Sequence, residues 1–245
     1  MANRTFLVLA GALFALTVLV RAPASWLSGA LPKSVECEQP GGSVWRGACS
    51  QLRVAGAALS DVRWQLHPAA LLGGHLELAL QSADPRAPAT ATLLLGLGGH
   101  HHVRDLHADV PIDTGFLPLF PSGWSGRLQL ALTDLEFSAG RLVAIHGTLA
   151  ANSLAQIRPP MPFGSYELRF PDAARTDGAI SGELRDLGGP LAVTGTLVIR
   201  HGSEYVLSGT ASARAEANAE LAKDVEFLGP ADAQGRRQYS LAGSF

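Results

Sequence analysis

The chain has 245 residues, of which 47% are hydrophobic and 16% charged, and its formal net charge at pH 7 is -2. Neither sign of charge forms a long run, which argues against a nucleic-acid partner, because phosphate binding calls for a basic stripe. The length suits one large domain or two small ones.

An uncharged, almost wholly apolar segment, Thr5–Val20, lies between Arg4 and Arg21. A bilayer core about 30 Å thick needs about 20 helical residues, and the apolar residues after Arg21 can lengthen the segment. We therefore predict an N-terminal transmembrane helix within residues 1–24, acting as an uncleaved anchor, and an exported domain in residues 25–245.

A cleaved signal peptide is the alternative interpretation of this segment. It would also have a basic start and a short apolar stretch, and Ala22-Pro23-Ala24 has the small-x-small form of a cleavage site. Arg21 directly after the apolar run, and a proline inside the site, count against cleavage. Both interpretations export the bulk of the chain.

The two cysteines, Cys37 and Cys49, follow soon after the apolar segment. In an oxidising compartment, two cysteines so close in an exported chain favour a local disulfide. Two unpaired buried thiols are the alternative. A metal site is a weaker interpretation, because no histidine lies between them or close by.

Tryptophans mark the first part of the exported region. Gly42–Gly47 holds Trp45 between two glycines and is either an exposed recognition loop or the opening hairpin of a curved sheet. Large aromatic side chains mostly serve burial, which favours packing for Trp45, for Trp64 and for Trp124. We expect none of them to take part in catalysis.

Apolar residues then alternate with polar ones along most of the chain, which is the pattern of strands with one buried face. Glycine-containing turn signals separate these stretches at short intervals, so the strands form an antiparallel meander. The alternating residues are Val62, Trp64 and Leu66; Leu76, Leu78 and Leu80; Leu128, Leu130 and Leu132; Tyr166, Leu168 and Phe170; Leu191, Val193, Leu197 and Ile199; Tyr205 and Leu207; and Tyr239, Leu241 and Phe245.

Glycines also recur at the starts of these strands or inside them. Glycine in a strand marks a bulge, sharp curvature or a close approach of two backbones, so we predict a long and strongly curved sheet. The glycines concerned are Gly126, Gly147, Gly178, Gly182, Gly195, Gly209 and Gly243.

Few segments have helical spacing. Ala215–Leu228 predicts one helix, ended by Gly229 with Pro230 beyond it. Pro68–Leu72 and Thr114–Leu119 are each long enough for a turn or two. The predicted fold is therefore mainly β with few short helices.

No group of residues has the pattern of an active site. His100-His101-His102, with His107 nearby, is the strongest metal candidate, but adjacent histidines on a strand point to opposite faces, and a solvated turn is favoured. No carboxylate pair or nucleophile elbow stands out. We predict no catalytic residues, no metal and no cofactor.

An ordered set of short motifs runs through nearly the whole chain. They are Gly42–Gly47, the tryptophan strand with its proline and double leucine at Val62–Gly73, Gly126–Leu130, Leu187–Leu191, Tyr205–Gly209 and Leu228–Arg236. Each motif alone is weakly specific, but their order and spacing together resemble the type II secretion system protein N family. Cys37 and Cys49 are a departure from this set of motifs.

This resemblance implies a single-pass protein of the cell inner membrane with a periplasmic β domain. It would belong to the Gram-negative apparatus that exports folded proteins across the outer membrane. The expected partners are the other subunits of that apparatus and the inner membrane. The family lacks a catalytic signature, so the resemblance implies a protein that is not an enzyme.

A relationship of this family to AsmA-like proteins gives an alternative function, a periplasmic lipid-binding or lipid-handling module with lipid as its partner. The two functions share a fold and differ in what contacts the concave face of the sheet. An open groove lined by leucine and valine would favour lipid. A closed interior filled by side chains would favour a structural role.

Overall fold

The computed structural model describes residues 6, 10–11, 17–18, 21–29, 35–54, 57–96, 98–112, 123–171, 175–176 and 178–244. Most of the predicted anchor lies outside these residues, as do Thr114–Leu119 and Phe245. Within the described ranges, no helix has both the length and the apolar character needed to cross a membrane. The anchor and the short helix at Thr114–Leu119 therefore stay predictions.

One antiparallel sheet of 15 strands contains nearly all of the described structure, which confirms a mainly β antiparallel meander. Strands pair in sequence order, except that the two-residue strands β2 and β11 pair beside β3 and β12. The strands are β1 (Val35–Glu38), β2 (Gly41–Gly42), β3 (Arg46–Val54), β4 (Ala57–His67), β5 (His75–Ser82), β6 (Ala89–Gly96), β7 (His100–Pro111), β8 (Trp124–Ser138), β9 (Arg141–Gln156), β10 (Met161–Phe170), β11 (Arg175–Thr176), β12 (Ala179–Gly188), β13 (Leu191–Arg200), β14 (Glu204–Ala213) and β15 (Arg237–Ser244).

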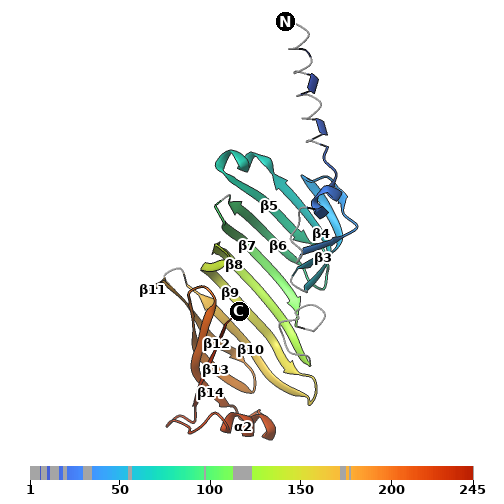
Figure 1. Ribbon diagram of the computed structural model, residues 1–245. Coiled ribbons are helices and arrows are strands. Elements are labelled where there is room, and N and C mark those ends of the chain that lie inside the picture. Colours follow the sequence, from blue (N-terminus) through green and yellow to red (C-terminus); the bar gives the residue numbers. More distant parts are fainter. Residues whose placement is uncertain are drawn as a thin grey trace.

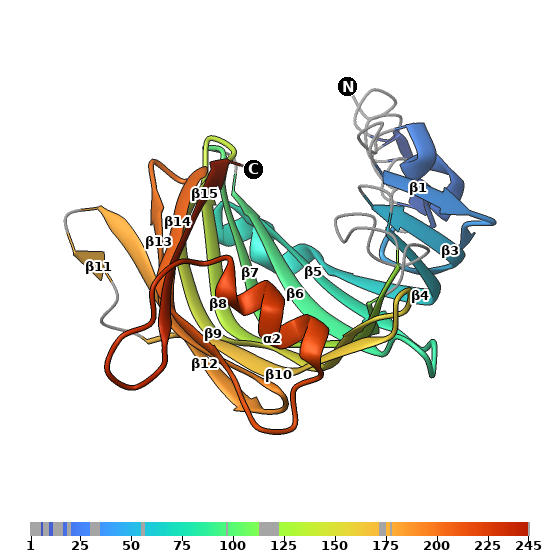
Figure 2. The ribbon, with the colours of Figure 1, turned by 90° about the horizontal axis from the view of Figure 1, so that it is seen from below.

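The sheet is long and bent into a trough, as the recurring glycines predicted. The strands follow one another along the long axis, from β3–β5 at one end to β12–β14 at the other (Figure 1). Seen along that axis, the strands curve around a concave inner face (Figure 2). Among the described strands, β1 and β15 are the two ends of the pairing order, so the sheet is open.

Bulges at glycines help to bend the long strands β8 and β9. The register of this pair shifts at Gly126, between Ser125 and Arg127, and again opposite Gly147. Both glycines have a positive φ angle, 149° and 122°, which residues with a side chain rarely adopt. A bulge bends its strand and increases the local twist, so these positions contribute to the curvature of the trough.

Short helices lie beside the sheet, namely η1 (Ala24–Gly29), η2 (Pro68–Gly73) and α2 (Ala219–Glu226). The turn expected at Pro68–Leu72 is thus confirmed. The helix expected over Ala215–Leu228 is shorter than predicted. The helix begins at Ala219. The side chain of Asn218, directly before it, accepts a hydrogen bond from the Leu221 N–H at 2.8 Å and caps the helix.

Candidate functional site

The inner face of the trough is apolar because the alternation of each strand is in register with that of its neighbours. Leu66 on β4 pairs with Leu78 on β5, which pairs with Leu93 on β6. The row continues through Val103, Leu135 and Ile145. Since side chains of paired residues share a face, one apolar row crosses the sheet from β4 to β9.

Between β7 and β14 this face is filled by a hydrophobic cluster. Partly buried neighbours extend the cluster from Leu106 on β7 to Tyr205 on β14. The buried members lie on β8, β9, β10, β12 and β13, which are successive neighbours in the sheet, so the cluster forms one continuous apolar layer along this part of the face. The buried members are Leu132, Ile145, Phe170, Ile180 and Ile199.

Toward the other end, on β4, β5 and β6, the same face is less well covered. The leucines there keep part of their surface exposed, unlike the buried members of the cluster. They are Leu66, Leu76, Leu78, Leu80, Leu93 and Leu95. This end of the trough therefore offers apolar surface that another apolar group could contact.

Helix α2 lies across the opposite end of the trough (Figure 2). Its buried side chains, Leu221 and Val225, pack with Met161 at the start of β10. Partly buried Phe163 and Leu191 extend this contact to the end of the strands. The helix thus covers apolar surface that the last strands would otherwise expose.

An ion pair fixes the segment that leads into α2. The Arg214 guanidinium donates to Asp186 Oδ1 at 2.6 Å and to the Gly189 carbonyl, so it holds the β12–β13 turn against the end of β14. The Tyr166 hydroxyl donates to the Leu191 carbonyl at 3.0 Å. Burial, and then the charge of Asp186, raise the pKa of Tyr166 to about 12. The sequence does not indicate this group, because its members come from β10, β12, β13 and the segments that flank β13 and β14, and share no motif.

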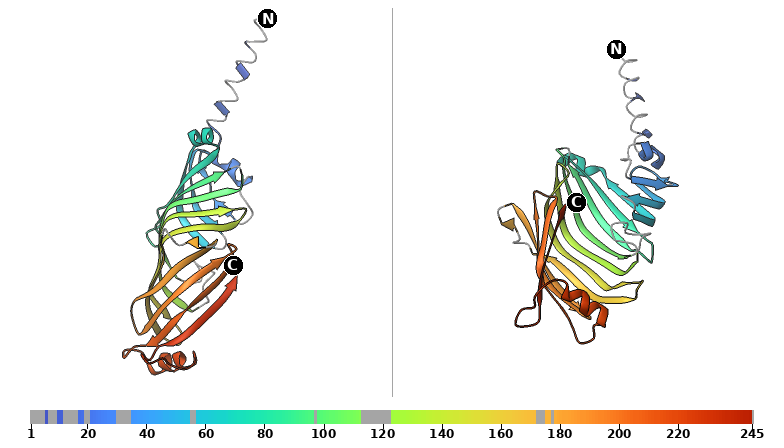
Figure 3. Two further views of the ribbon diagram at one scale, coloured as in Figure 1. Left: turned by 90° about the vertical axis from the view of Figure 1, so that its left-hand side faces the viewer. Right: turned by 60° about the horizontal axis from the view of Figure 1, so that its bottom comes forward.

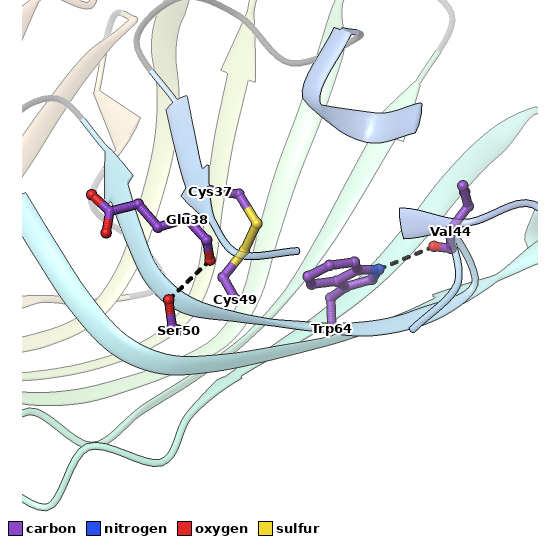
Figure 4. The surroundings of a disulfide bond; sticks show 6 residues. All are labelled: Cys37, Glu38, Val44, Cys49, Ser50 and Trp64. Atoms are coloured by element: carbon purple, nitrogen blue, oxygen red, sulfur yellow. Dashed lines mark hydrogen bonds between the residues drawn. A yellow bond between two sulfur atoms is a disulfide. The ribbon is translucent and has the colours of Figure 1, made fainter. Parts of the chain in front are cut away.

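Cys37 and Cys49 meet at the other end of the trough and form a disulfide (Figure 4). The bridge joins β1 to β3, and the two Cα atoms lie 5.6 Å apart, within the range that a disulfide requires. Beside it, Trp64 Nε1 donates to the Val44 carbonyl at 3.0 Å. Trp64 therefore holds the β2–β3 hairpin over β4, and Gly42–Gly47 is the opening hairpin of the sheet.

The histidines expected in a turn lie instead in strand β7. His100 begins β7, and the turn precedes it at Gly98 and Gly99, because each histidine takes a place in the pairing with β8. His102 Nδ1 lies 3.6 Å from Asp134 Oδ1 on β8. Among the residues that the structure describes, no group of three His, Cys, Asp or Glu side chains could hold a metal ion.

The outer face of the sheet carries the polar side chains. Arg127 Nε donates to Asp109 Oδ1 at 2.7 Å, and its guanidinium also reaches the Arg86 carbonyl. A depression of about 540 Å³ is lined mainly by polar residues of β3 to β7, including Arg46, Arg63 and His107. These groups suit hydrogen bonding with a polar partner.

Comparisons with known proteins agree with the motif order. A family model described as "Type II secretion system (T2SS), protein N" matches residues 33–240. The "Type II secretion system protein N" of Aeromonas hydrophila is 27% identical over 229 residues, covering 89% of each chain. That of Klebsiella pneumoniae is 26% identical and covers 100% of this chain and 98% of its own.

A third relative with the same name, from Vibrio cholerae, is 24% identical over 219 residues and covers 87% of this chain. No solved structure matches the chain significantly. The family model extends from before the disulfide into the last strand, and each of the three relatives covers 87% or more of the chain. The chain therefore belongs to the type II secretion system protein N family.

Proposed function

We propose that this protein is a component of the type II secretion system that acts through protein contacts at the periplasmic face of the inner membrane, without catalysing a reaction. Its family and the names of its relatives support the secretion system. The observation that supports the mode of action is the open sheet, which ends in an edge strand.

That edge is β15. It pairs with β14 on one side, and in the described residues no strand pairs with its other side. An edge strand presents backbone N–H and C=O groups that can pair with a strand of another protein. Leu241 on β15 is 59% exposed, and Gln238 and Ser240 are exposed as well. We infer that another subunit adds a strand here.

Site-specific photo-cross-linking tests this contact in cells. A cross-linker at Ser240 on β15 should capture another subunit of the secretion system. The matched control is Thr196, which is also exposed but lies on β13, with a strand on either side. Equal yields of the same adducts from both positions would contradict docking at the edge.

The membrane location rests on the apolar segment. We propose that residues 1–24 are an uncleaved anchor and that residues 25–245 form the periplasmic domain. The start of the fold supports this arrangement, since Ala22 and Ala24 are buried and Pro23 forms a bridge with Ser43. Cleavage after Ala24 would remove these contacts from the sheet.

Intact-mass measurement of the membrane-extracted protein tests the anchor. We expect the mass of the chain with its first residues retained. Loss of about the first 24 residues would instead identify a signal peptide, which such segments resemble.

The lipid-handling alternative has one observation in its favour, the partly exposed leucines on the inner face of β4–β6. Against it, the side chains of the cluster between β7 and β14 pack against one another and leave five of its members buried. A deletion strain separates the two functions. Selective loss of secreted hydrolases from the exported proteins supports a secretion role, whereas outer-membrane lipid defects with normal secretion would favour lipid handling.

A further inference from the structure

The connection between β4 and β5 is a helix, η2, that contributes nothing to the core. None of its residues is buried, and Leu71 and Leu72 are 51% and 94% exposed. From Pro68 to Gly74 the sequence carries no charge. Single exposed leucines are common on protein surfaces, but η2 presents two adjacent ones on an uncharged turn.

The position of η2 in the molecule indicates what its exposed leucines contact. Helices η1 and η2 lie at the same end of the molecule, opposite α2, in every view along its side (Figures 1 and 3). Trp26 in η1 is also exposed, at 59%. Apolar side chains are thus presented at this end of the trough on two separate elements.

The apolar segment of the sequence ends at the same place. Only Arg21 separates Val20 from Ala22, whose carbonyl accepts the Val44 N–H at 2.9 Å. One residue spans at most about 3.6 Å, so the sheet begins within a few ångströms of the end of the apolar segment. If that segment is anchored in the bilayer, this end of the trough lies at the lipid surface.

We propose that η2 inserts Leu71 and Leu72 into the inner membrane beside the anchor. Trp26 then lies at the interface, where tryptophan is enriched because its ring is amphipathic. Apolar side chains on a surface helix bind a bilayer by burial in the boundary between headgroups and acyl chains. With the anchor, η2 gives the sheet a second attachment, which fixes its orientation to the membrane. This inference rests on the proposed anchor.

Site-directed spin labelling of the full chain tests the contact in vesicles of phosphatidylethanolamine and phosphatidylglycerol. Cys37 and Cys49 are paired, so a thiol introduced by Leu72→Cys is labelled selectively. The matched control is Phe227→Cys, because Phe227 is another exposed apolar residue, at 79%, but belongs to the α2 end. Neither side chain is buried, so both variants should fold.

The readout is the ratio of collisions with oxygen, which enters lipid, to collisions with a water-soluble nickel complex. We expect this ratio to be severalfold higher at position 72 than at position 227. Equal ratios in protein that floats with the vesicles would overturn the η2 contact while leaving the anchor intact. Protection of position 72 from both reagents would indicate a protein partner and also overturn it. Failure of both variants to float would refute the anchor, and the η2 contact with it.

Discussion

Single side chains link parts of the sheet that are distant in the sequence. Trp64 reaches back to Val44, and Arg214 joins Asp186 and Gly189. Each of these side chains donates to a backbone carbonyl of another segment, and Arg214 also pairs with the Asp186 carboxylate. Such contacts matter most at the two ends of the trough, where fewer strands pack together.

The disulfide should contribute measurably to stability. The variant Cys37→Ser/Cys49→Ser should lose about 3 kcal/mol of unfolding free energy, because the bridge restricts the unfolded chain across a short loop. Urea unfolding with and without reductant measures this loss. Reductant should lower the midpoint of the wild type and leave that of the variant unchanged. Quantitative thiol labelling of both cysteines in denatured, unreduced protein would contradict the pairing.

The Tyr166 hydroxyl should lose its proton at a higher pH than an ordinary tyrosine does. Its ordinary pKa is 10, whereas burial and Asp186 raise it to about 12 in the folded protein. The folded state therefore keeps a proton that the unfolded state loses, so the stabilisation is complete below pH 10 and is lost as the pH rises toward 12. The absorbance of phenolate, compared between the wild type and Tyr166→Phe, isolates this titration. Ionisation of Tyr166 near pH 10 in the folded protein would contradict it.

At the scale of elements, bulges and short helices shape a sheet that is otherwise a simple meander. Alternation alone would give strands paired in one constant register. Extra residues instead shift the register between β8 and β9 and between β9 and β10. Helix α2 then closes the end where the last strands stop. Its capping residue, Asn218, sets where this cover begins.

Gly147→Ala should destabilise the protein more than Gly99→Ala. Both glycines have positive φ, so each substitution costs about 1–3 kcal/mol of backbone strain. Only at Gly147 would the new methyl group also collide with the Ala131 carbonyl, whereas Gly99 has open space around it. Thermal unfolding compares the two variants. Equal losses would show that the strand relaxes at Gly147.

At the scale of the whole molecule, the two parts of the trough differ in how far their apolar side chains are buried. The cluster from β7 to β14 buries side chains of successive strands, while the leucines of β4 to β6 keep part of their surface exposed. A long sheet with an edge at each end can contact a partner along its length and still be attached at one end. This arrangement suits a component of a larger assembly.

Leu132→Ala tests whether the cluster stabilises the trough as a whole. Leu132 is 3% exposed, and removing a buried leucine side chain costs about 2–5 kcal/mol. The control Leu241→Ala, at 59% exposure, should change the unfolding free energy by about 0.5 kcal/mol or less. Chemical unfolding of both variants measures the difference. Similar values would mean that the strands are held by their pairing alone.

The class of fold could be predicted from the sequence, because a period of two along a strand is a local property. Val62, Trp64 and Leu66 already indicate one buried face, and β4 contains all three. The glycines within strands predicted curvature for the same reason, since positive φ and close backbone approach depend on a single residue. The order of the motifs likewise pointed to the family.

Which apolar side chains of the inner face are buried and which stay partly exposed follows from the tertiary structure and not from the sequence pattern. That depends on how residues of separate strands come together in one cluster, and these residues lie far apart in the chain, as Leu132 and Ile199 do. The tertiary structure also decided the partnership of Arg214 with Asp186 and the strand position of His100–His102. Local sequence patterns do not predict these contacts, because the pairing register and the curvature of the sheet together determine which side chains meet.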